Sequence, residues 1–66
     1  MTITLNGDKH EFAAPMTISA LLRQLDIDSR RVAVELNLAV VKKVAYDSSV
    51  IKEGDEVEIV NFVGGG

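Results

Sequence analysis

Residues 17–25, "TISALLRQL", decide the fold. Within this stretch the apolar residues recur at i, i+3, i+4 and i+7, which is the spacing of one apolar stripe along a two-turn helix. These residues are Ile18, Leu21, Leu22 and Leu25. Thr17 stands just before the stripe, where a hydroxyl side chain makes a suitable N-cap. No other segment has a clear helical pattern, so the flanking segments must cover the stripe.

The segments before this helix have the pattern of a β-hairpin. Residues 2–5, "TITL", alternate polar and apolar side chains, as a half-buried strand does. Asn6 and Gly7 follow, and this pair is a strong hairpin signal because both residues accept a positive φ. Residues 9–13, "KHEFA", are then expected to form the returning strand.

The segments after the helix predict three more strands. Two of them, residues 32–36 ("VAVEL") and 39–41 ("AVV"), flank a turn at Asn37, and the last is "EVEIVNF" within residues 56–62. Residues 43–51 show neither period, so we expect a loop with one helical turn around residues 46–49. Residues 52–56, "KEGDE", predict a turn in which Gly54 supplies the positive φ and Asp55 caps through its side chain.

This order of elements predicts an α+β fold. One short helix can bury its stripe only against one face of a small sheet. We therefore expect a β-grasp (ubiquitin-like) fold, ββαβββ, with a mixed sheet of four to five strands. Residues 1–66 are expected to form a single domain, with residues 63–66 as a mobile glycine tail.

Composition and charge exclude several classes of function. Seven basic and ten acidic residues give a net charge of −3, and no basic stripe follows any element, which disfavours nucleic-acid binding. The absence of cysteine and the single histidine disfavour a metal site. The N-terminal residues do not resemble a signal peptide, and no apolar run is long enough to cross a membrane. We expect a cytoplasmic protein.

The outward face of the last strand changes character along its length. If Val57 and Ile59 face the helix, Glu56 and Glu58 face solvent and so do the next two residues on that face, Val60 and Phe62. Exposed apolar residues beside charged ones are typical of a protein interface. We expect Val60, Phe62 and Val63 to contact a partner. Two alternatives are that Phe62 folds over the core edge and that a bulge shifts the register.

Acidic side chains are frequent near this last strand. Residues 53, 55, 56 and 58 are all acidic, and the simplest interpretation is a face exposed to water. A second interpretation is that these charges steer a basic partner.

The residues Gly64, Gly65 and Gly66 suggest chemistry at a terminal carboxylate. A carboxylate is a poor electrophile and must first be activated, for example as an acyl-adenylate. Glycines without a Cβ allow an extended backbone to enter a narrow enzyme channel. The chain shows no catalytic alternative, since His10 lies in a hairpin strand without positioned partners. We expect a substrate of enzymes rather than an enzyme.

The whole chain resembles the ThiS family of sulfur carrier proteins of thiamine biosynthesis. The resemblance lies in "ITLNG", "TISALLRQLDI", "VAVELNLAVVKK" and, most specifically, "GDEVEIVNFVGGG". The chain departs from the family pattern at two positions. It has a third glycine, Gly64, before the usual pair, and it has Leu38 at a turn where relatives tend to carry a small or polar residue.

The resemblance implies a function and a set of partners. A ubiquitin-activating-like (ThiF-type) enzyme would adenylate Gly66 with ATP and Mg, neither of which this chain would bind itself. A persulfide donor, such as a cysteine desulfurase, would convert the adenylate to a thiocarboxylate, and a ThiG-type thiazole synthase would accept the sulfur. The alternatives are a carrier for molybdopterin or another pathway, and a non-catalytic interaction module.

Overall fold

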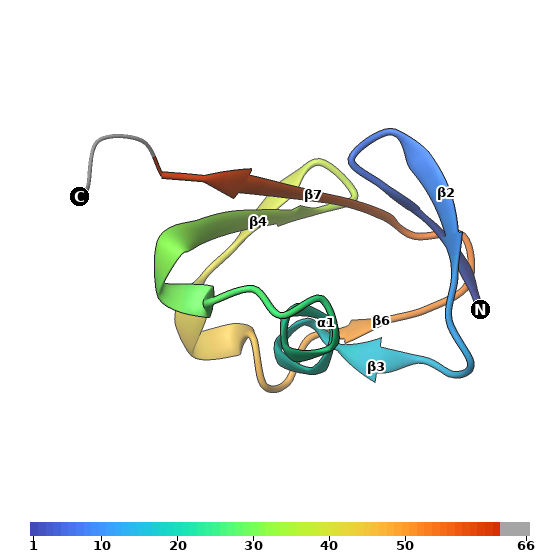
Figure 1. Cartoon of the computed structure of the whole chain (residues 1–66), viewed down its shortest axis with the longest axis horizontal. Helices are drawn as coiled ribbons and strands as arrows, with labels where there is room; N and C mark the ends of the chain where they lie inside the picture. The colour runs from blue at the N-terminus through green and yellow to red at the C-terminus, as the bar shows by residue number, and fades with distance from the viewer. Residues whose placement is uncertain (63–66) are drawn as a thin grey trace.

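The computed structural model describes residues 1–62 (Figure 1). Within them the strands are β1 (Thr2–Leu5), β2 (Asp8–Glu11), β3 (Met16–Thr17), β4 (Val32–Leu36), β5 (Ala39–Val41), β6 (Val50–Ile51) and β7 (Glu56–Asn61). The helix α1 (Ile18–Gln24) and two 3-10 helices, η1 (Ser29–Arg31) and η2 (Lys43–Ala45), complete the described elements.

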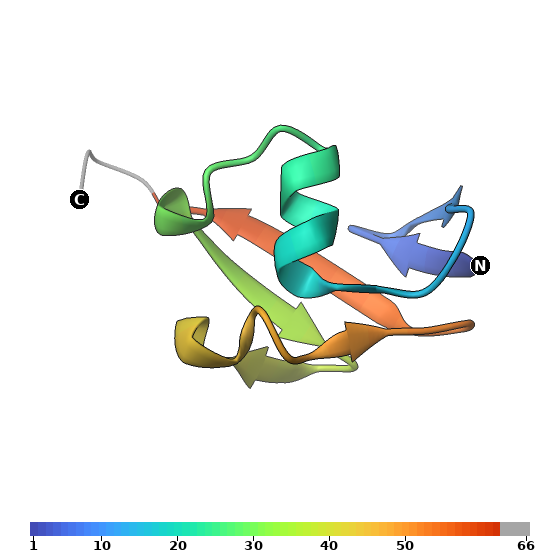
Figure 2. The ribbon, with the colours of Figure 1, turned by 90° about the horizontal axis from the view of Figure 1, so that it is seen from below.

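The main sheet has five strands in the order β2-β1-β7-β4-β5. The β1–β7 pair is parallel, and the other three pairs are antiparallel. Helix α1 covers one face of this sheet, while β3 and β6 form a separate two-stranded sheet beside it (Figures 1 and 2). The expected β-grasp fold, a mixed sheet packed on one short helix, is confirmed.

The helix begins and packs as its sequence predicts. The Thr17 side chain accepts a hydrogen bond of 3.1 Å from the Ala20 N–H and so caps the first turn. Ile18, Leu21 and Leu22 are fully buried, and Leu25 is half-buried against them. Asp26 then adopts a φ of +60°, which ends the helix and turns the chain toward η1.

Both hairpins of the main sheet turn through two residues with positive φ. In the first, Asn6 (φ +49°) and Gly7 (φ +87°) form the predicted turn. In the second, Asn37 (φ +52°) and Leu38 (φ +71°) do the same. Such turns match the right-handed twist of the flanking strands. Leu38 is unusual here, because a Cβ makes the left-handed region unfavourable.

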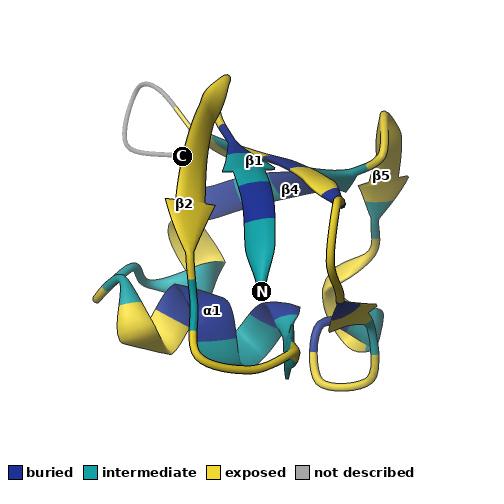
Figure 3. Ribbon diagram, turned by 90° about the vertical axis from the view of Figure 1, so that its right-hand side faces the viewer, coloured by how far each residue is buried: buried dark blue, intermediate teal, exposed yellow. Residues whose placement is uncertain are grey.

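The core is aliphatic apart from one tyrosine and joins the inner face of the sheet to α1. Its buried members are Ile3, Leu5, Ile18, Leu21, Leu22, Val32, Val34, Tyr46, Ile51 and Val57. Strand β2, by contrast, is exposed along its whole length (Figure 3). The core therefore lies under the centre of the sheet, where β1, β7 and β4 run side by side.

The expectation for residues 43–51 was incomplete. A 3-10 helix at Lys43–Ala45 comes first, and the turn expected at residues 46–49 follows it, closed by a 2.8 Å bond from the Ser49 N–H to the Ala45 carbonyl; Tyr46 is buried. Val50 and Ile51 form β6, which pairs with β3 through Met16↔Ile51 and Thr17↔Val50. A strand of two residues is too short to show a period, so the sequence pattern cannot reveal it.

The prediction that Asp55 belongs to a solvent-exposed acidic face was also wrong. Its side chain is buried, and its carboxylate accepts hydrogen bonds from the Lys52 N–H (2.9 Å) and the Asn37 amide (3.1 Å). The predicted side-chain cap at this turn is thus confirmed, and so is the positive φ of Gly54, at +84°. Glu53, Glu56 and Glu58 are exposed, as expected.

Candidate functional site

The two faces of strand β7 differ as the sequence alternation predicts. Val57 is fully buried and Ile59 packs against the core, so these side chains face α1. On the opposite face the exposed glutamates are followed by Val60 and Phe62, which are 54% and 55% exposed. The predicted exposure of this apolar pair is confirmed, and the two alternatives that would have buried Phe62 are not observed.

Phe62 is held between the two 3-10 helices, although half of its surface is exposed. Its N–H donates a 2.9 Å hydrogen bond to the carbonyl of Arg31, at the end of η1. On the other side, the Lys43 ammonium of η2 lies 5.2 Å from the centroid of its ring. An exposed cation–π contact of this kind contributes about 0.5–1 kcal/mol. These contacts fix the position from which the chain continues toward residue 63.

The remaining predicted site residues are Val63, Gly64, Gly65 and Gly66. All of them lie outside the described residues. The structure thus brings together Val60 and Phe62 and describes the attachment point of the glycine segment, which is the end of a central strand.

Four basic side chains at the same end were not predicted as part of the site. Arg30 and Arg31 belong to η1, while Lys42 and Lys43 lie at the start of η2, and all four are exposed. Neither pair forms a stripe along a single element, so the sequence pattern does not reveal the four residues as one group. The visible signal was the two doublets, "RR" and "KK", each next to a predicted strand.

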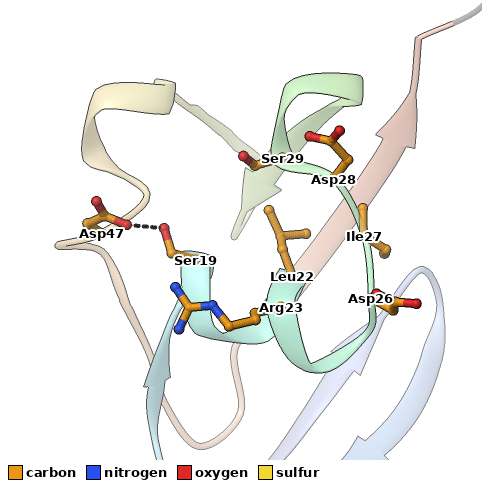
Figure 4. A pocket seen from close by; sticks show the side chains of 8 residues that line it. All are labelled: Ser19, Leu22, Arg23, Asp26, Ile27, Asp28, Ser29 and Asp47. Atoms are coloured by element: carbon orange, nitrogen blue, oxygen red, sulfur yellow. Dashed lines mark hydrogen bonds between the residues drawn. The ribbon is translucent and has the colours of Figure 1, made fainter.

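A polar hollow of about 470 Å³ lies beside α1 (Figure 4). Its walls come from α1, from the segment leading into η1 and from Asp47. The Ser19 hydroxyl donates a hydrogen bond to Asp47 across one side of it. The hollow is apart from Val60 and Phe62, neither of which lines it.

Asp28, on the rim of this hollow, has a perturbed carboxyl group. The Arg30 side chain donates two hydrogen bonds to it, of 3.1 and 2.9 Å, and the Arg30 N–H donates a third of 2.9 Å. These bonds favour the charged form and lower the pKa of Asp28 from its usual 3.8 to about 2. The same contacts raise the pKa of Arg30. Asp28 therefore acts as an ionised cap of η1.

His10 is the single histidine of the chain. His10 is exposed on β2 and stacks on Phe12 with ring centroids 6.5 Å apart. Within residues 1–62 no three His, Cys, Asp or Glu side chains are grouped as a metal site would require. None of the helical segments in this range has the length and apolar character needed to cross a bilayer.

Comparisons with known proteins agree with this geometry. The model of the ThiS family matches residues 3–66. A crystal structure of the thiamine biosynthesis protein ThiS from Geobacter metallireducens has a TM-score of 0.89 and 36% identity, with 100% of each chain covered. The sulfur carrier protein ThiS of Escherichia coli is 27% identical over 66 residues, and the alignment covers 100% of both chains.

Two longer relatives carry the name thiazole synthase. The one from Paramagnetospirillum magneticum is 48% identical and the one from Magnetococcus marinus 44% identical, each over 66 residues. This chain spans 20% of the length of each. Since the family model covers nearly the whole sequence and the Geobacter structure matches it from end to end, the chain belongs to the ThiS family.

Proposed function

We propose that this chain is a sulfur carrier of thiamine biosynthesis. In this proposal residues 1–66 act as one carrier domain, and the carboxylate of Gly66 is converted to a thiocarboxylate that supplies the sulfur of the thiazole ring. The observation that carries the proposal is the family match extending through residue 66. The Escherichia coli relative, named sulfur carrier protein ThiS, supports it.

The proposed reaction starts from a carboxylate that is unreactive at neutral pH. Attack of a Gly66 carboxylate oxygen on the α-phosphate of ATP forms an acyl-adenylate and releases pyrophosphate. A persulfide sulfur then attacks the carbonyl and displaces AMP, and cleavage of the remaining S–S bond by a thiol leaves the thiocarboxylate. ATP and Mg belong to the adenylating enzyme in this scheme, and the carrier contributes only its terminal group.

The arrangement at Phe62 suits this role. The last described residue is fixed by a hydrogen bond to η1 and a cation–π contact with η2. The four residues that follow can span at most roughly 13–14 Å. Gly64 and Gly65, which lack a Cβ, would let the backbone approach catalytic groups closely. Val60, Phe62 and Val63 would contact the surface around the entrance of the partner's active site.

Two partners follow from the proposal. The first is a ThiF-type adenylating enzyme, supplied with sulfur by a persulfide donor such as a cysteine desulfurase. The second is a ThiG-type thiazole synthase, which accepts the sulfur. The relatives named thiazole synthase support this second link, because part of each is similar to this chain. The carrier itself would be a co-substrate and not an enzyme, and we expect it in the cytoplasm, where ATP is available.

Reconstitution tests the proposal directly. The chain is incubated with the adenylating enzyme, Mg·ATP and a persulfide donor, and its intact mass is measured. We expect one oxygen to be replaced by sulfur, and no change in a variant lacking Gly66. A chain that keeps its unmodified mass under conditions that modify a known carrier would contradict the proposal and favour an interaction module.

The pathway needs a second measurement. Thiocarboxylate-bearing carrier is offered to thiazole synthase and, in parallel, to molybdopterin synthase. Sulfur should appear in the thiazole product and not in molybdopterin. The opposite result would retain the carrier chemistry and move the protein to the alternative pathway.

A further inference from the structure

The basic residues of this protein are concentrated at the end where β7 stops. Arg30, Arg31, Lys42 and Lys43, which we call the basic end, account for four of the seven basic residues. They belong to segments before β4 and after β5, more than ten positions apart in the sequence. In Figures 1 and 2 the two 3-10 helices lie at the same end of the molecule as the last residues of β7.

Contacts to Phe62 show how the fold brings these two segments to one place. Strand β4 pairs with β7 in the register Val32↔Asn61, so η1, which directly precedes β4, lies next to the end of β7. Phe62 then bonds to the Arg31 carbonyl at 2.9 Å, and the Lys43 ammonium lies 5.2 Å from its ring centroid. The basic end therefore flanks Phe62, the last described residue, to which residues 63–66 are attached.

Only part of this positive charge is compensated locally. Asp28 pairs with Arg30 at 2.9 Å and lies 3.9 Å from Arg31, yet these arginine side chains are 86% and 84% exposed. Neither lysine has a carboxylate of residues 1–62 within 4.0 Å. Asp47, which follows η2, is hydrogen-bonded to Ser19.

The rest of the molecule has the opposite charge. Counting Asp28 and Asp47 with the basic end gives it four basic and two acidic residues, which leaves three basic and eight acidic residues elsewhere. The side chains thus contribute a net charge of +2 at this end and of −5 on the remainder of the molecule, out of a side-chain total of −3. A molecule polarised in this way is turned by an external field, so an acidic surface attracts the basic end and repels the rest.

We propose that the basic end docks on an acidic rim around the active-site entrance of the adenylating enzyme. This inference rests on the proposed function and names the chemistry of the partner surface. An enzyme that acts on Gly66 must bring its surface to within roughly 13–14 Å of Phe62, the reach of four residues. The basic end lies in that contact zone, where aspartate and glutamate side chains would complement it. The charge asymmetry of the carrier then turns the end of β7 toward the enzyme.

Nucleic acid fits these charges less well than an acidic protein surface does. A phosphate backbone would attract the basic end. A long polyanion would also come close to the rest of the molecule, where acidic residues are in excess and would repel it. Phe62 is the aromatic residue in contact with the basic end, whereas single-strand binding uses several stacking platforms. A compact acidic rim contacts one end of the carrier only.

Charge reversal at two matched pairs tests the inference. The test variant is Lys42→Glu/Lys43→Glu, and the control is Lys9→Glu/Lys52→Glu, which changes the net charge equally at exposed positions away from the basic end. Association with the adenylating enzyme is followed by stopped-flow fluorescence without ATP, at about 0.05 M and about 0.5 M salt, because screening distinguishes steering from contact. Circular dichroism confirms that both variants fold.

Electrostatic steering changes association rates by roughly 10–1,000-fold. We expect the test variant to associate at least about tenfold more slowly at low salt, with the difference mostly lost at high salt. The control should associate at close to the wild-type rate, because its added negative charges lie away from the contact zone. The single variant Lys43→Arg leaves Lys42 in place and keeps both the charge and the contact with Phe62. It should therefore associate at the wild-type rate. The inference would be overturned if both pairs slow association equally, if the effect of the test variant is unchanged by salt, or if the wild type does not associate.

The two proposals fail in different ways. If the wild type acquires sulfur but the test variant associates normally, the proposed function stands and the basic end has no docking role. If association depends on the basic end while Gly66 never acquires sulfur, the docking surface stands and the carrier chemistry is wrong.

Discussion

Leu38 is expected to limit the stability of the fold. It occupies the second turn position of the β4–β5 hairpin with a φ of +71°, and its side chain is 80% exposed. A side chain in the left-handed region costs about 1–2 kcal/mol because its Cβ crowds the following carbonyl. Burial returns little of this energy, since most of the leucine surface remains in water.

Replacing Leu38 with glycine should therefore stabilise the protein. The substitution removes the strain of about 1–2 kcal/mol. It also gives the unfolded chain more freedom, which disfavours folding by about 0.4–1 kcal/mol. When the middle of each range is taken, the difference predicts a net gain of about 0.5–1 kcal/mol. For a domain of this size 1 kcal/mol corresponds to about 4–8 °C, so the melting temperature should rise by roughly 2–8 °C.

Urea denaturation followed by circular dichroism measures this gain, with an unchanged m-value as a check that only stability has changed. The matched control is Asn37→Gly, one position earlier in the same turn. Its side chain accepts a 2.9 Å bond from the Glu56 N–H and donates one of 3.1 Å to Asp55. Losing both should destabilise the fold by about 1–2 kcal/mol despite the positive φ. If Leu38→Gly is neutral or destabilising, the leucine side chain must make contacts that outweigh its backbone strain.

Two further predictions concern carboxylates. Asp55→Ala should lower the free energy of unfolding by about 1–3 kcal/mol, because it leaves the Lys52 N–H and the Asn37 amide without an acceptor. Urea titration measures this loss, and a loss below its error would show that the two hydrogen bonds do not stabilise the fold. The second prediction concerns Asp28, whose pKa is lowered from 3.8 to about 2 by hydrogen bonds from Arg30. The charged form therefore stabilises the folded state above pH 3.8, and this contribution is lost as the pH falls through about 2. The melting temperatures of wild type and Asp28→Asn should therefore converge between about pH 5 and pH 2, and a constant difference would show that the ion pair is irrelevant.

Features of the fold that depend on neighbouring residues could be predicted from the sequence. The Asn6–Gly7 turn, the Thr17 cap and the apolar stripe of α1 all follow from local chemistry, and all three are confirmed. The resemblance to the ThiS family is confirmed by the family match and by the Geobacter structure.

Features that depend on distant pairing could not be predicted in this way. Strands β3 and β6 are two residues each and exist because they pair with each other. Asp55 was assigned to a solvated face because its partner Asn37 lies 18 residues away, and only the fold shows that the two meet. The residues of the site differ in the same respect. Exposure of Phe62 follows from strand alternation, whereas the basic end requires two separate loops to converge.

The position of β7 explains why its end is a suitable place to attach a reactive group. The strand lies between β1 and β4 in the sheet, and the Asn6 side chain adds two hydrogen bonds to the Ile59 backbone, of 2.7 and 3.2 Å. With the Phe62 N–H bonded to the Arg31 carbonyl, the described chain is held in place up to its last residue. Ordering the backbone costs about 1–2 kcal/mol per residue, so a partner gains from every residue that the fold already holds. Attachment to an edge strand or a loop would leave more residues for the partner to order. Under the proposed function, the partner would contact the exposed apolar pair and the basic end, and both surfaces lie directly beside the attachment point.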